Sequence, residues 1–290
     1  MTIRHLRIFE AVAREGSMNR AAARLYLSQP TVSKAVKELE EYYGVRLFER
    51  LSQRLYITRE GELLLSYARQ VLEGFDRMER ALRRPDRPQE LRVGCSVTVG
   101  TALINPLLDQ AAQALKGCQV MVEVNNTSVI EEMVLSNRVD LGLVEGIVRH
   151  PDLLHIPVLT DRLCLVSAPD HPLARKKNLK LADLEGWELI SRERGSVDRN
   201  QLELLLRQEG VRMVRSWNCT NTEAIKNGVA AGRGVAVLSS LVVRKELDRG
   251  ELVALEVEGL PILRPIEAVY HKDKFLSSPM KALLEACGKE

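Results

Sequence analysis

The chain has 290 residues, of which 45% are hydrophobic and 28% are charged, as in a folded globular protein with room for two or three domains. Its five cysteines are scattered and form no C-x-x-C pair, which excludes a disulfide scaffold and favours reduced thiols. The net charge of +3 is uneven, with +5 in residues 1–89 and −2 in the remainder. A nucleic-acid partner would therefore meet the N-terminal part.

The N-terminal segment predicts a helix from Thr2 to Arg14 that Gly16 ends, with Leu6, Phe9 and Val12 facing inward. Charges run through this segment, so it lacks the continuous apolar core of a signal peptide. No later stretch is long enough to span a bilayer. We therefore expect a cytoplasmic protein with no membrane partner.

Residues 19–43 predict two helices joined by a tight turn. The first, from Arg20 to Leu25, is rich in small alanines that permit a close crossing, and Asn19 is its expected N-cap. Ser28 and Pro30 mark the start of the second helix, where a hydroxyl can accept from free amides and a missing N–H costs little. One buried stripe runs along this second helix, formed by Val32, Val36, Leu39 and Tyr43.

The opposite face of the second helix combines short hydrogen-bonding side chains with lysines, the set needed to enter a major groove. A helix that is merely solvated on this face is the alternative interpretation. We expect Lys34 and Lys37 to hold phosphates. The residues expected to approach base edges are Gln29, Pro30, Thr31 and Ser33.

The run AAARLYLSQPTVSKAVKELEEYYGVRLFER, from Ala21 to Arg50, resembles the signature of the LysR-type transcriptional regulators. That signature commonly reads Ala-Ala, Leu, Ser-Gln-Pro, Val-Ser, Leu-Glu, Gly and Leu-Phe-x-Arg at this spacing. The departures are Tyr43, where leucine is usual, and Ile57, where a leucine usually precedes threonine. The resemblance implies a winged helix-turn-helix that binds double-stranded DNA as a homodimer or homotetramer, with RNA polymerase as a further candidate partner.

Two short extended runs, Leu47 to Arg50 and Leu55 to Thr58, predict a two-stranded wing after the reading helix. We expect Arg54 in this wing to contact a phosphate. A hairpin that only closes the small core is the alternative.

Thr58 is expected to cap a long helix that reaches about Arg84, before a Pro-rich hinge at residues 83–88. Its apolar residues alternate in steps of four and three, as in a heptad seam, so we expect it to pair with the same helix of a second chain. Packing within its own core is the alternative. The expected dimerisation residues are Leu64, Ala68, Val71, Phe75, Met78 and Leu82.

Beyond the hinge the pattern changes to strands alternating with helices, which indicates a parallel sheet. We expect strands at 91–95, 120–124, 141–144, 163–167, 187–191, 215–218, 235–238 and 266–270, with helices at 101–115, 128–138, 197–208 and 223–231. Two lobes, each with its own sheet, are the natural interpretation. The order resembles the effector domain of LysR-type regulators, which is similar to periplasmic solute-binding proteins.

The predicted fold class is therefore α/β: a mostly helical N-terminal winged helix-turn-helix, a long linker helix and a two-lobed effector domain. The expected boundaries are 1–58 for the DNA-binding domain, 59–89 for the linker and hinge, and 90–290 for the effector domain. Within the last, we expect lobe I at about 90–161 and 266–290 and lobe II at about 162–265.

Several turns that follow these strands are rich in hydroxyls, where open parallel sheets commonly bind ligands. Ser, Thr and Asn side chains in such turns also cap helices where no ligand binds, and this structural role is the alternative to ligand binding for each of them. The run RVGCSVTVGTALINPLL resembles the family's first effector strand and turn, which implies effector contacts at Ser96 and Thr98, and at Thr127 or Ser128 in the next turn. Arg192, with Arg194 beside it, could neutralise a carboxylate, sulfate or phosphate, and Ser196 could add a hydrogen bond.

The sequence gives no reason to expect an enzyme. The five histidines show no metal-ligand spacing, and the Gly232-Arg233-Gly234 turn lacks the context of a dinucleotide fingerprint. No cofactor or metal is expected. An exported solute-binding protein is a rival that would need a signal segment, and a regulator whose second domain serves only assembly is the other alternative.

Overall fold

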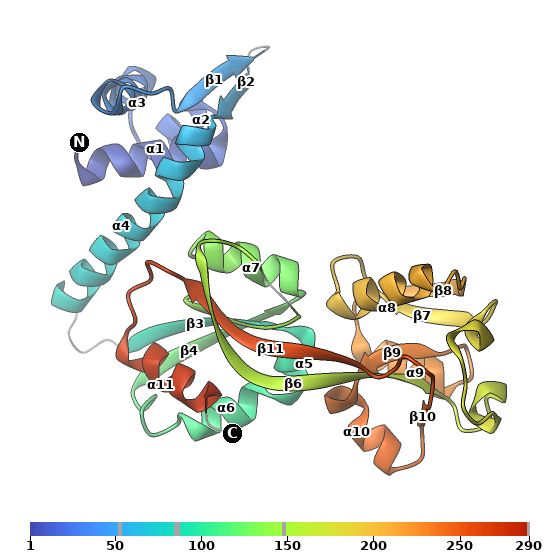
Figure 1. Cartoon of the computed structure of the whole chain (residues 1–290). Coiled ribbons are helices and arrows are strands. Elements are labelled where there is room, and N and C mark those ends of the chain that lie inside the picture. Colours follow the sequence, from blue (N-terminus) through green and yellow to red (C-terminus); the bar gives the residue numbers. More distant parts are fainter. Residues whose placement is uncertain (52–53, 84–87, 147–148, 289–290) are drawn as a thin grey trace. The chain divides into compact units, whose positions relative to one another are not determined.

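A computed structural model describes residues 1–51, 54–83, 88–146 and 149–288. The chain forms two compact units: an N-terminal unit of residues 1–88 with 273–275, and a C-terminal unit of residues 89–272 with 276–290. The N-terminal unit is mostly helical, whereas helices flank a twisted sheet in the C-terminal unit (Figure 1). No helix within the described ranges is long and apolar enough to cross a membrane.

The N-terminal unit contains the expected helix-turn-helix, wing and linker helix. The expected N-cap at Asn19 is wrong: Ser17 caps the second helix by accepting from the Arg20 amide, and Asn19 lies inside the first turn. Most of the predicted hinge, residues 84–87, lies outside the described residues. The elements are α1 (Ile3–Glu15), α2 (Met18–Arg24), α3 (Gln29–Tyr43), β1 (Phe48–Leu51), β2 (Arg54–Ile57) and α4 (Arg59–Arg83).

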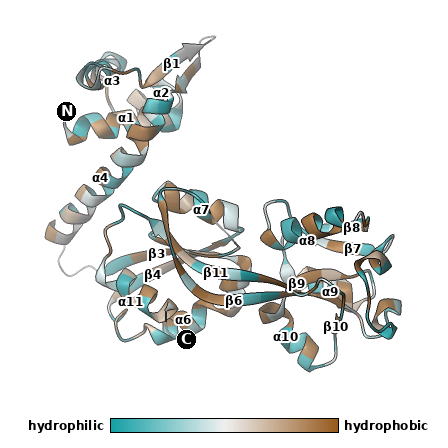
Figure 2. Cartoon of the chain, viewed as in Figure 1, coloured by the Kyte–Doolittle hydropathy of each residue, from teal (hydrophilic) through white to brown (hydrophobic). Residues whose placement is uncertain are grey.

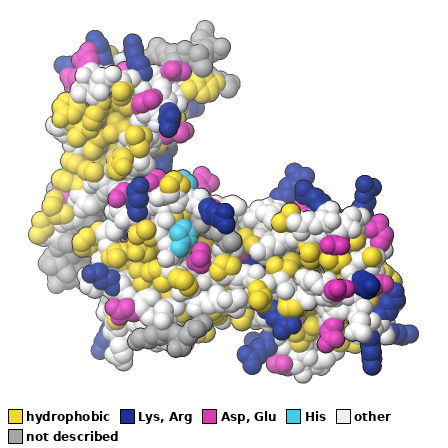
Figure 3. Space-filling view, in the orientation of Figure 1, with side chains coloured by type: hydrophobic (Ala, Val, Ile, Leu, Met, Phe, Trp, Pro, Cys, Tyr) yellow, Lys and Arg dark blue, Asp and Glu magenta, His cyan; other side chains and the backbone are white. Residues whose placement is uncertain are grey.

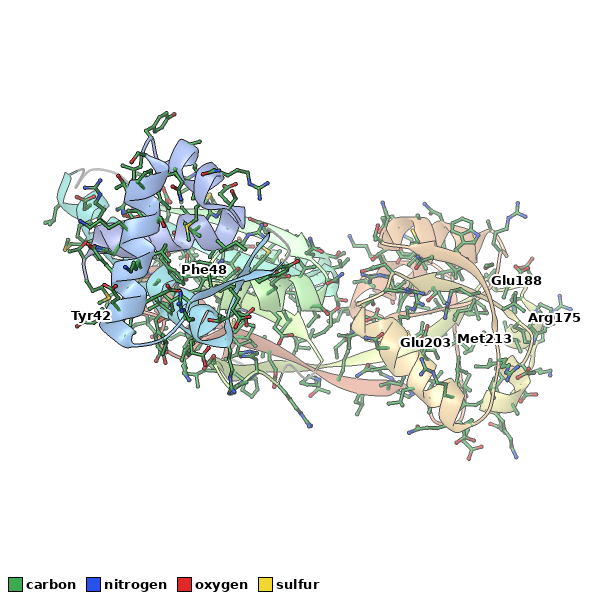
Figure 4. The ribbon with its side chains drawn as sticks, turned by 90° about the horizontal axis from the view of Figure 1, so that it is seen from above. Tyr42, Phe48, Arg175, Glu188, Glu203 and Met213 are labelled. Carbon is green, nitrogen blue, oxygen red and sulfur yellow. The ribbon has the colours of Figure 1, made fainter. Side chains whose placement is uncertain are left out.

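The core of the N-terminal unit forms where α1, α2 and α3 cross. Phe9 is fully buried, and its ring lies 5.4 Å from the ring of Phe48. Phe48, labelled in Figure 4, is the first residue of the wing. Val32 and Leu39 of α3 are buried as predicted. Tyr43, predicted in the same stripe, is 42% exposed because the last turn of α3 extends past the core.

The linker helix α4 is seated against the wing at its first turn. Thr58 caps it as predicted, since its Oγ1 accepts from the Gly61 amide at 3.0 Å. A Cβ placed on Gly61 would lie 2.3 Å from the carbonyl oxygen of Leu47. Only glycine therefore lets the helix approach the strand this closely.

We expect Gly61→Ala to destabilise the N-terminal unit by about 1–3 kcal/mol, because the added methyl group would collide with a backbone carbonyl. The matched control is Gly74→Ala on the same helix. Nothing lies within 4 Å of a Cβ at Gly74, so alanine should increase the stability of the helix by as much as about 1 kcal/mol. Scanning calorimetry of the N-terminal transition measures both variants. Equal stability of the two variants would contradict the close contact between Gly61 and the backbone of Leu47.

The C-terminal unit contains one long mixed sheet, a small two-stranded sheet and the helices that cover them. Its strands are β3 (Gln89–Ser96), β4 (Cys118–Asn125), β5 (Leu141–Glu145), β6 (Leu153–Ser167), β7 (Glu188–Arg192), β8 (Val214–Cys219), β9 (Ala236–Ser239), β10 (Val253–Leu255) and β11 (Ile262–His271). Its helices are α5 (Val97–Ala102), α6 (Ile104–Gln110), α7 (Thr127–Leu135), α8 (Val197–Gln208), α9 (Thr222–Ala230), α10 (Ser240–Asp248), α11 (Ser278–Cys287), η1 (Pro172–Arg175) and η2 (Leu181–Leu184).

Two lobes are present, but their sheets are not separate as predicted. The strand order is β10-β6-β11-β5-β3-β4, with β9 also paired to β6, so one hydrogen-bonded path runs through both lobes. The long antiparallel strands β6 and β11 connect the lobes (Figure 1). Hydrophilic residues interrupt both strands where they pass between the lobes (Figure 2), which is why only their outer parts were predicted as strands.

The first lobe contains the parallel core predicted from the sequence. β3 pairs in parallel with both β4 and β5, and α7 packs on this sheet. The single helix predicted at 101–115 is instead two short helices, α5 and α6, followed by turns. α5 begins directly after Ser96, so the turn predicted to carry effector contacts is already helical.

Candidate functional site

The reading helix α3 is fixed by its two ends and its back. Ser28 Oγ accepts from the Thr31 amide at 3.3 Å, and Gly44 ends the helix with a φ of +69°. Val32, Val36 and Leu39 are buried against α1 and α2. The front of the helix is therefore held outward by packing behind it.

The predicted DNA contacts on α3 lie on that front. Lys34 and Lys37 are strongly exposed and form surface pairs with Glu38 and Glu41, at 3.7 and 3.4 Å, which are weak enough to exchange for phosphate. Pro30 is exposed as well. The remaining predicted base contacts, Gln29, Thr31 and Ser33, are half-buried at the start of the helix.

The turn between α2 and α3 presents a residue that the sequence reasoning missed. Tyr26 is 97% exposed and has a φ of +55°, so its ring projects from the turn that precedes the reading helix. The available signal was the third large residue in the turn, since Leu25 and Leu27 on either side of Tyr26 pack against the core and leave its ring to solvent. Its hydroxyl is a candidate phosphate contact.

In the wing, β1 and β2 pair in antiparallel register, with Leu51 opposite Arg54. Arg54 thus begins the second strand, at the tip of the hairpin. Its side chain lies outside the described residues, so the predicted phosphate contact stays a prediction.

The predicted dimerisation seam on α4 is divided between two environments. Ala68 is 1% exposed in the core of its own unit and Leu64 packs against that core, so neither forms the outer face as predicted. Phe75 is half-buried. The exposed apolar stripe, part of the hydrophobic surface in Figure 3, contains Leu63, Tyr67, Val71, Met78 and Leu82.

Close contacts join the two lobes at the end of β5 and the start of α8. Gly146 has a φ of +83°, and a Cβ there would lie 2.8 Å from Val197 Cγ1. A Cβ on Gly195 would lie 3.4 Å from the side-chain nitrogen of Asn126, which caps α7. The turn that starts α8 in the second lobe therefore packs directly against the first lobe.

Two predicted effector contacts, Ser96 and Thr98, are buried and already hydrogen-bonded to protein. Both hydroxyls donate to the carboxylate of Glu145 at the end of β5, Thr98 to Oε1 at 3.3 Å. Thr127 donates to the backbone carbonyl of the same residue at 3.2 Å. Ser128, the predicted alternative to Thr127, is exposed. The structure thus brings three of the predicted residues together around Glu145.

Arg264 of β11 is fully buried and contacts residues of both lobes. Its Nε donates to Asp161 of β6 at 2.8 Å and its Nη1 donates to Asp198 of α8. Nη1 also lies 3.6 Å from Glu145 Oε1, while Nη2 donates to Thr98 Oγ1 at 3.2 Å. This one guanidinium therefore connects β6, α8, β5 and the start of α5.

Arg192 is buried at the end of β7, and its charge is already paired. Two of its nitrogens donate to Glu193 at 2.9 and 3.1 Å, and Nη1 lies 3.8 Å from Asp198. Arg194 is exposed. Ser196 is 3% exposed, and its Oγ has no hydrogen-bond partner among the residues that the structure describes. We name the interlobe cluster by its charged residues: Glu145, Asp161, Arg192, Glu193, Asp198 and Arg264.

Sequence reasoning missed most of the interlobe cluster. The available signal was a charged residue in an apolar strand pattern, as in Glu145 after LGLV, Asp161 within VLTDRLCLV and Arg264 within PILRPIEAV. Such residues are buried only when they are paired. Their mutual contacts could not be read from the sequence, because the residues come from separate elements.

The pKa of Glu145 is raised to about 7, mainly by burial and also by the neighbouring Asp198, against the opposing effects of Arg264 and Arg192. Burial likewise raises the pKa of Cys95 to about 12 and that of Cys287 to about 12. Both thiols therefore stay protonated and unreactive at neutral pH.

Within the described residues, no group of three or more His, Cys, Asp or Glu side chains could hold a metal ion.

A surface cavity of about 740 Å³ lies elsewhere, on the second lobe, lined by Arg162, Lys180 and Ser240 among others. None of the predicted effector contacts lines it. The predicted effector contacts Ser96, Thr98 and Thr127 thus lie around Glu145 and not in this cavity.

The N-terminal unit contains a helix-turn-helix with an exposed reading face, a wing and a linker helix, and the C-terminal unit contains two lobes with a polar cluster between them. These features define a DNA-binding regulator with a ligand-sensing domain. Two family models match the chain: "Bacterial regulatory helix-turn-helix protein, lysR family" over residues 3–62 and "LysR substrate binding domain" over residues 86–290. The chain belongs to the LysR family of transcriptional regulators. Members of this family are regulators and not enzymes.

Individual relatives are similar to this chain over two thirds or more of its length. The RuBisCO operon transcriptional regulator of Allochromatium vinosum is 33% identical over 287 residues, which cover 98% of this chain and 95% of that protein. The solved regulatory domain of CcmR from Synechocystis PCC6803, in complex with 2-PG, is 30% identical with a TM-score of 0.65, covering 69% of this chain and 96% of that one. Full-length CbnR in complex with its target DNA shares the fold, with 23% identity, a TM-score of 0.56 and complete coverage of both chains.

Proposed function

We propose that this DNA-binding regulator senses a small anion between the lobes of its C-terminal unit and passes the signal to α3 through a change in lobe closure. The observation that carries the proposal is the buried, unpartnered Ser196 Oγ at the start of α8, where free helix amides favour an anion. The relative whose structure contains 2-PG supports an anionic ligand. No cofactor is part of the proposal.

The proposed contacts to the anion are Ser96, Thr98, Thr127, Ser196 and the exposed Ser128. Arg192 serves as a positioning residue, because Glu193 and Asp198 already neutralise its charge. Coupling between such a site and DNA is typically worth about 1–3 kcal/mol. Thermal unfolding of the full-length protein with sulfate, phosphate and 2-phosphoglycolate tests the proposal, and indifference to all three would count against an anionic effector.

The exposed stripe on α4 supports assembly through this helix, so that two copies of α3 face a two-fold symmetric operator. Native mass spectrometry separates dimer from tetramer and detects a retained ligand. A regulator whose second domain serves only assembly is the second candidate, and an anion-insensitive protein would favour it. The proposed setting is the cytoplasm, with RNA polymerase as a partner at the promoter.

We expect substitutions on α3 to separate affinity from sequence choice. Lys37→Ala should weaken binding to all duplexes alike and reduce the salt dependence by about one phosphate equivalent, since Lys37 is an exposed charge on the front of the helix. Ser33→Ala or Gln29→Ala should relax sequence choice and change the salt slope little. Fluorescence anisotropy at several salt concentrations measures both effects. Identical behaviour of the two kinds of variant would contradict this division of roles.

A further inference from the structure

The interlobe cluster contains two arginines and four carboxylates, and both cations already have acidic partners. Arg264 donates hydrogen bonds to Asp161 and Asp198, and Arg192 donates to Glu193. An entering anion would thus find no unpaired positive charge in this cluster of described residues. It would instead bring a further negative charge next to buried carboxylates.

Glu145 is the carboxylate of the cluster that is least held by a cation. Its nearest approach to Arg264 is 3.6 Å, whereas Arg264 donates a 2.8 Å hydrogen bond to Asp161 and a further hydrogen bond to Asp198. Its two oxygens accept from Ser96 and Thr98 instead. These are the hydroxyls that the proposed anion needs, so the ionised side chain of Glu145 would compete with the anion for them.

From these contacts, and resting on the proposed function, we infer that the site takes up its anion together with one proton, which Glu145 receives on its carboxylate. The proton comes from hydronium or protonated buffer in the solvent: the donor's bond to hydrogen breaks as the O–H bond of the carboxyl group forms, and no other covalent bond changes. The neutral carboxyl group can donate to the anion, and the two hydroxyls can rotate towards it. Each proton offsets one unit of the charge that the anion brings.

The surroundings of Glu145 fit this role. The charged groups that act on it are Arg264 from β11, Asp198 from α8 and Arg192 from β7, and Cys95 of β3 is close enough for its own pKa to be raised by Glu145. The pKa of Glu145 is raised to about 7, so the group is poised to change its protonation near neutral pH. Above that pH the free site is ionised, and binding an anion requires a proton.

Isothermal titration of the full-length protein with sulfate, which does not titrate in this range, tests the inference in buffers of different ionisation enthalpy. We expect uptake of close to one proton per anion at pH 8 and close to none at pH 5.5. The dissociation constant should be flat below about pH 6 and should rise about tenfold per pH unit above about pH 7.5. Phosphate and 2-phosphoglycolate serve as further probes at pH 8.

The decisive variant is Glu145→Gln, which keeps the shape of the side chain and removes the titration. It should bind sulfate with no proton uptake and with an affinity independent of pH. Glu267→Gln is the matched control, since it makes the same chemical change on β11 at a carboxylate that pairs with His155 outside the interlobe cluster, and it should retain the uptake. Thermal unfolding of each variant establishes that it is folded at both pH values.

The outcomes separate the two proposals. Binding without proton uptake in the unsubstituted protein, or uptake that persists in Glu145→Gln, would overturn the role of Glu145 and leave the anionic effector standing. Failure of sulfate, phosphate and 2-phosphoglycolate to bind at any pH would overturn both. Loss of uptake in Glu145→Gln alone, with binding retained, is the result that the inference requires.

Discussion

Replacing Arg264 by methionine is expected to lower the free energy of unfolding of the C-terminal unit by about 3–5 kcal/mol. The side chain is fully buried and is the direct partner of Asp161 and Asp198. Methionine fills similar space but leaves Asp161 without a cation, and Asp198 with only Arg192 at 3.8 Å, in a low-dielectric interior. The loss therefore comes from uncompensated charge and not from a cavity.

Tryptophan fluorescence in urea measures this loss selectively, because both tryptophans, Trp187 and Trp217, lie in the C-terminal unit. Arg162→Met is the matched control: Arg162 is an exposed neighbour of Asp161 on β6 and should tolerate the change. Adding Asp161→Asn to Arg264→Met should recover part of the loss, since one of the unpaired charges is removed. Equal stability of Arg264→Met and Arg162→Met would contradict the central place of Arg264.

Gly146→Ala is expected to weaken anion binding at least about tenfold while leaving the affinity for DNA of the ligand-free protein intact. The added methyl group would lie 2.8 Å from Val197 Cγ1, so the turn that starts α8 could not reach the first lobe as it does here. A site made by both lobes would then be incomplete. Calorimetric titration with the anion and anisotropy with operator DNA measure the two affinities separately.

Backbone strain is the competing explanation, because Gly146 has a φ of +83°. Gly186→Ala controls for it: Gly186 has a φ of +76° and nothing within 4 Å of a Cβ. This substitution should lower the free energy of unfolding by about 1–2 kcal/mol and leave anion binding unchanged. Val197→Ala added to Gly146→Ala should restore binding by removing the collision. If both glycine variants bind the anion alike, lobe contact at this point is irrelevant to the site.

Features encoded by neighbouring residues could be predicted from the sequence. The start and end of α3 follow from Ser28 and Gly44, and the limits of α8 agree with the predicted 197–208, because caps and periodicity act within one or two turns. One exception is the helix predicted at 101–115, which is divided into α5 and α6, and another is α2, where two capping residues stand close together. Ser17 took the role assigned to Asn19.

Features that depend on distant pairing could not be predicted. β6 and β11 are long because they pair with each other over both lobes, and this pairing carries polar residues such as Asp161 and Arg264 into the interior. Ser96 and Thr98 were identified as site residues through family resemblance. Their partner Glu145 was not, because it is 47 residues further along the chain than Thr98 and only the fold brings them together.

The central claim is that α3 reads duplex DNA once per subunit of a symmetric assembly. Selection from a pool of randomised duplexes by the full-length protein, at moderate salt, tests it most directly. We predict enrichment of a partly palindromic sequence whose half-sites lie about one helical turn, or a multiple of it, apart. Recovery of the starting pool without any enriched sequence would contradict the claim.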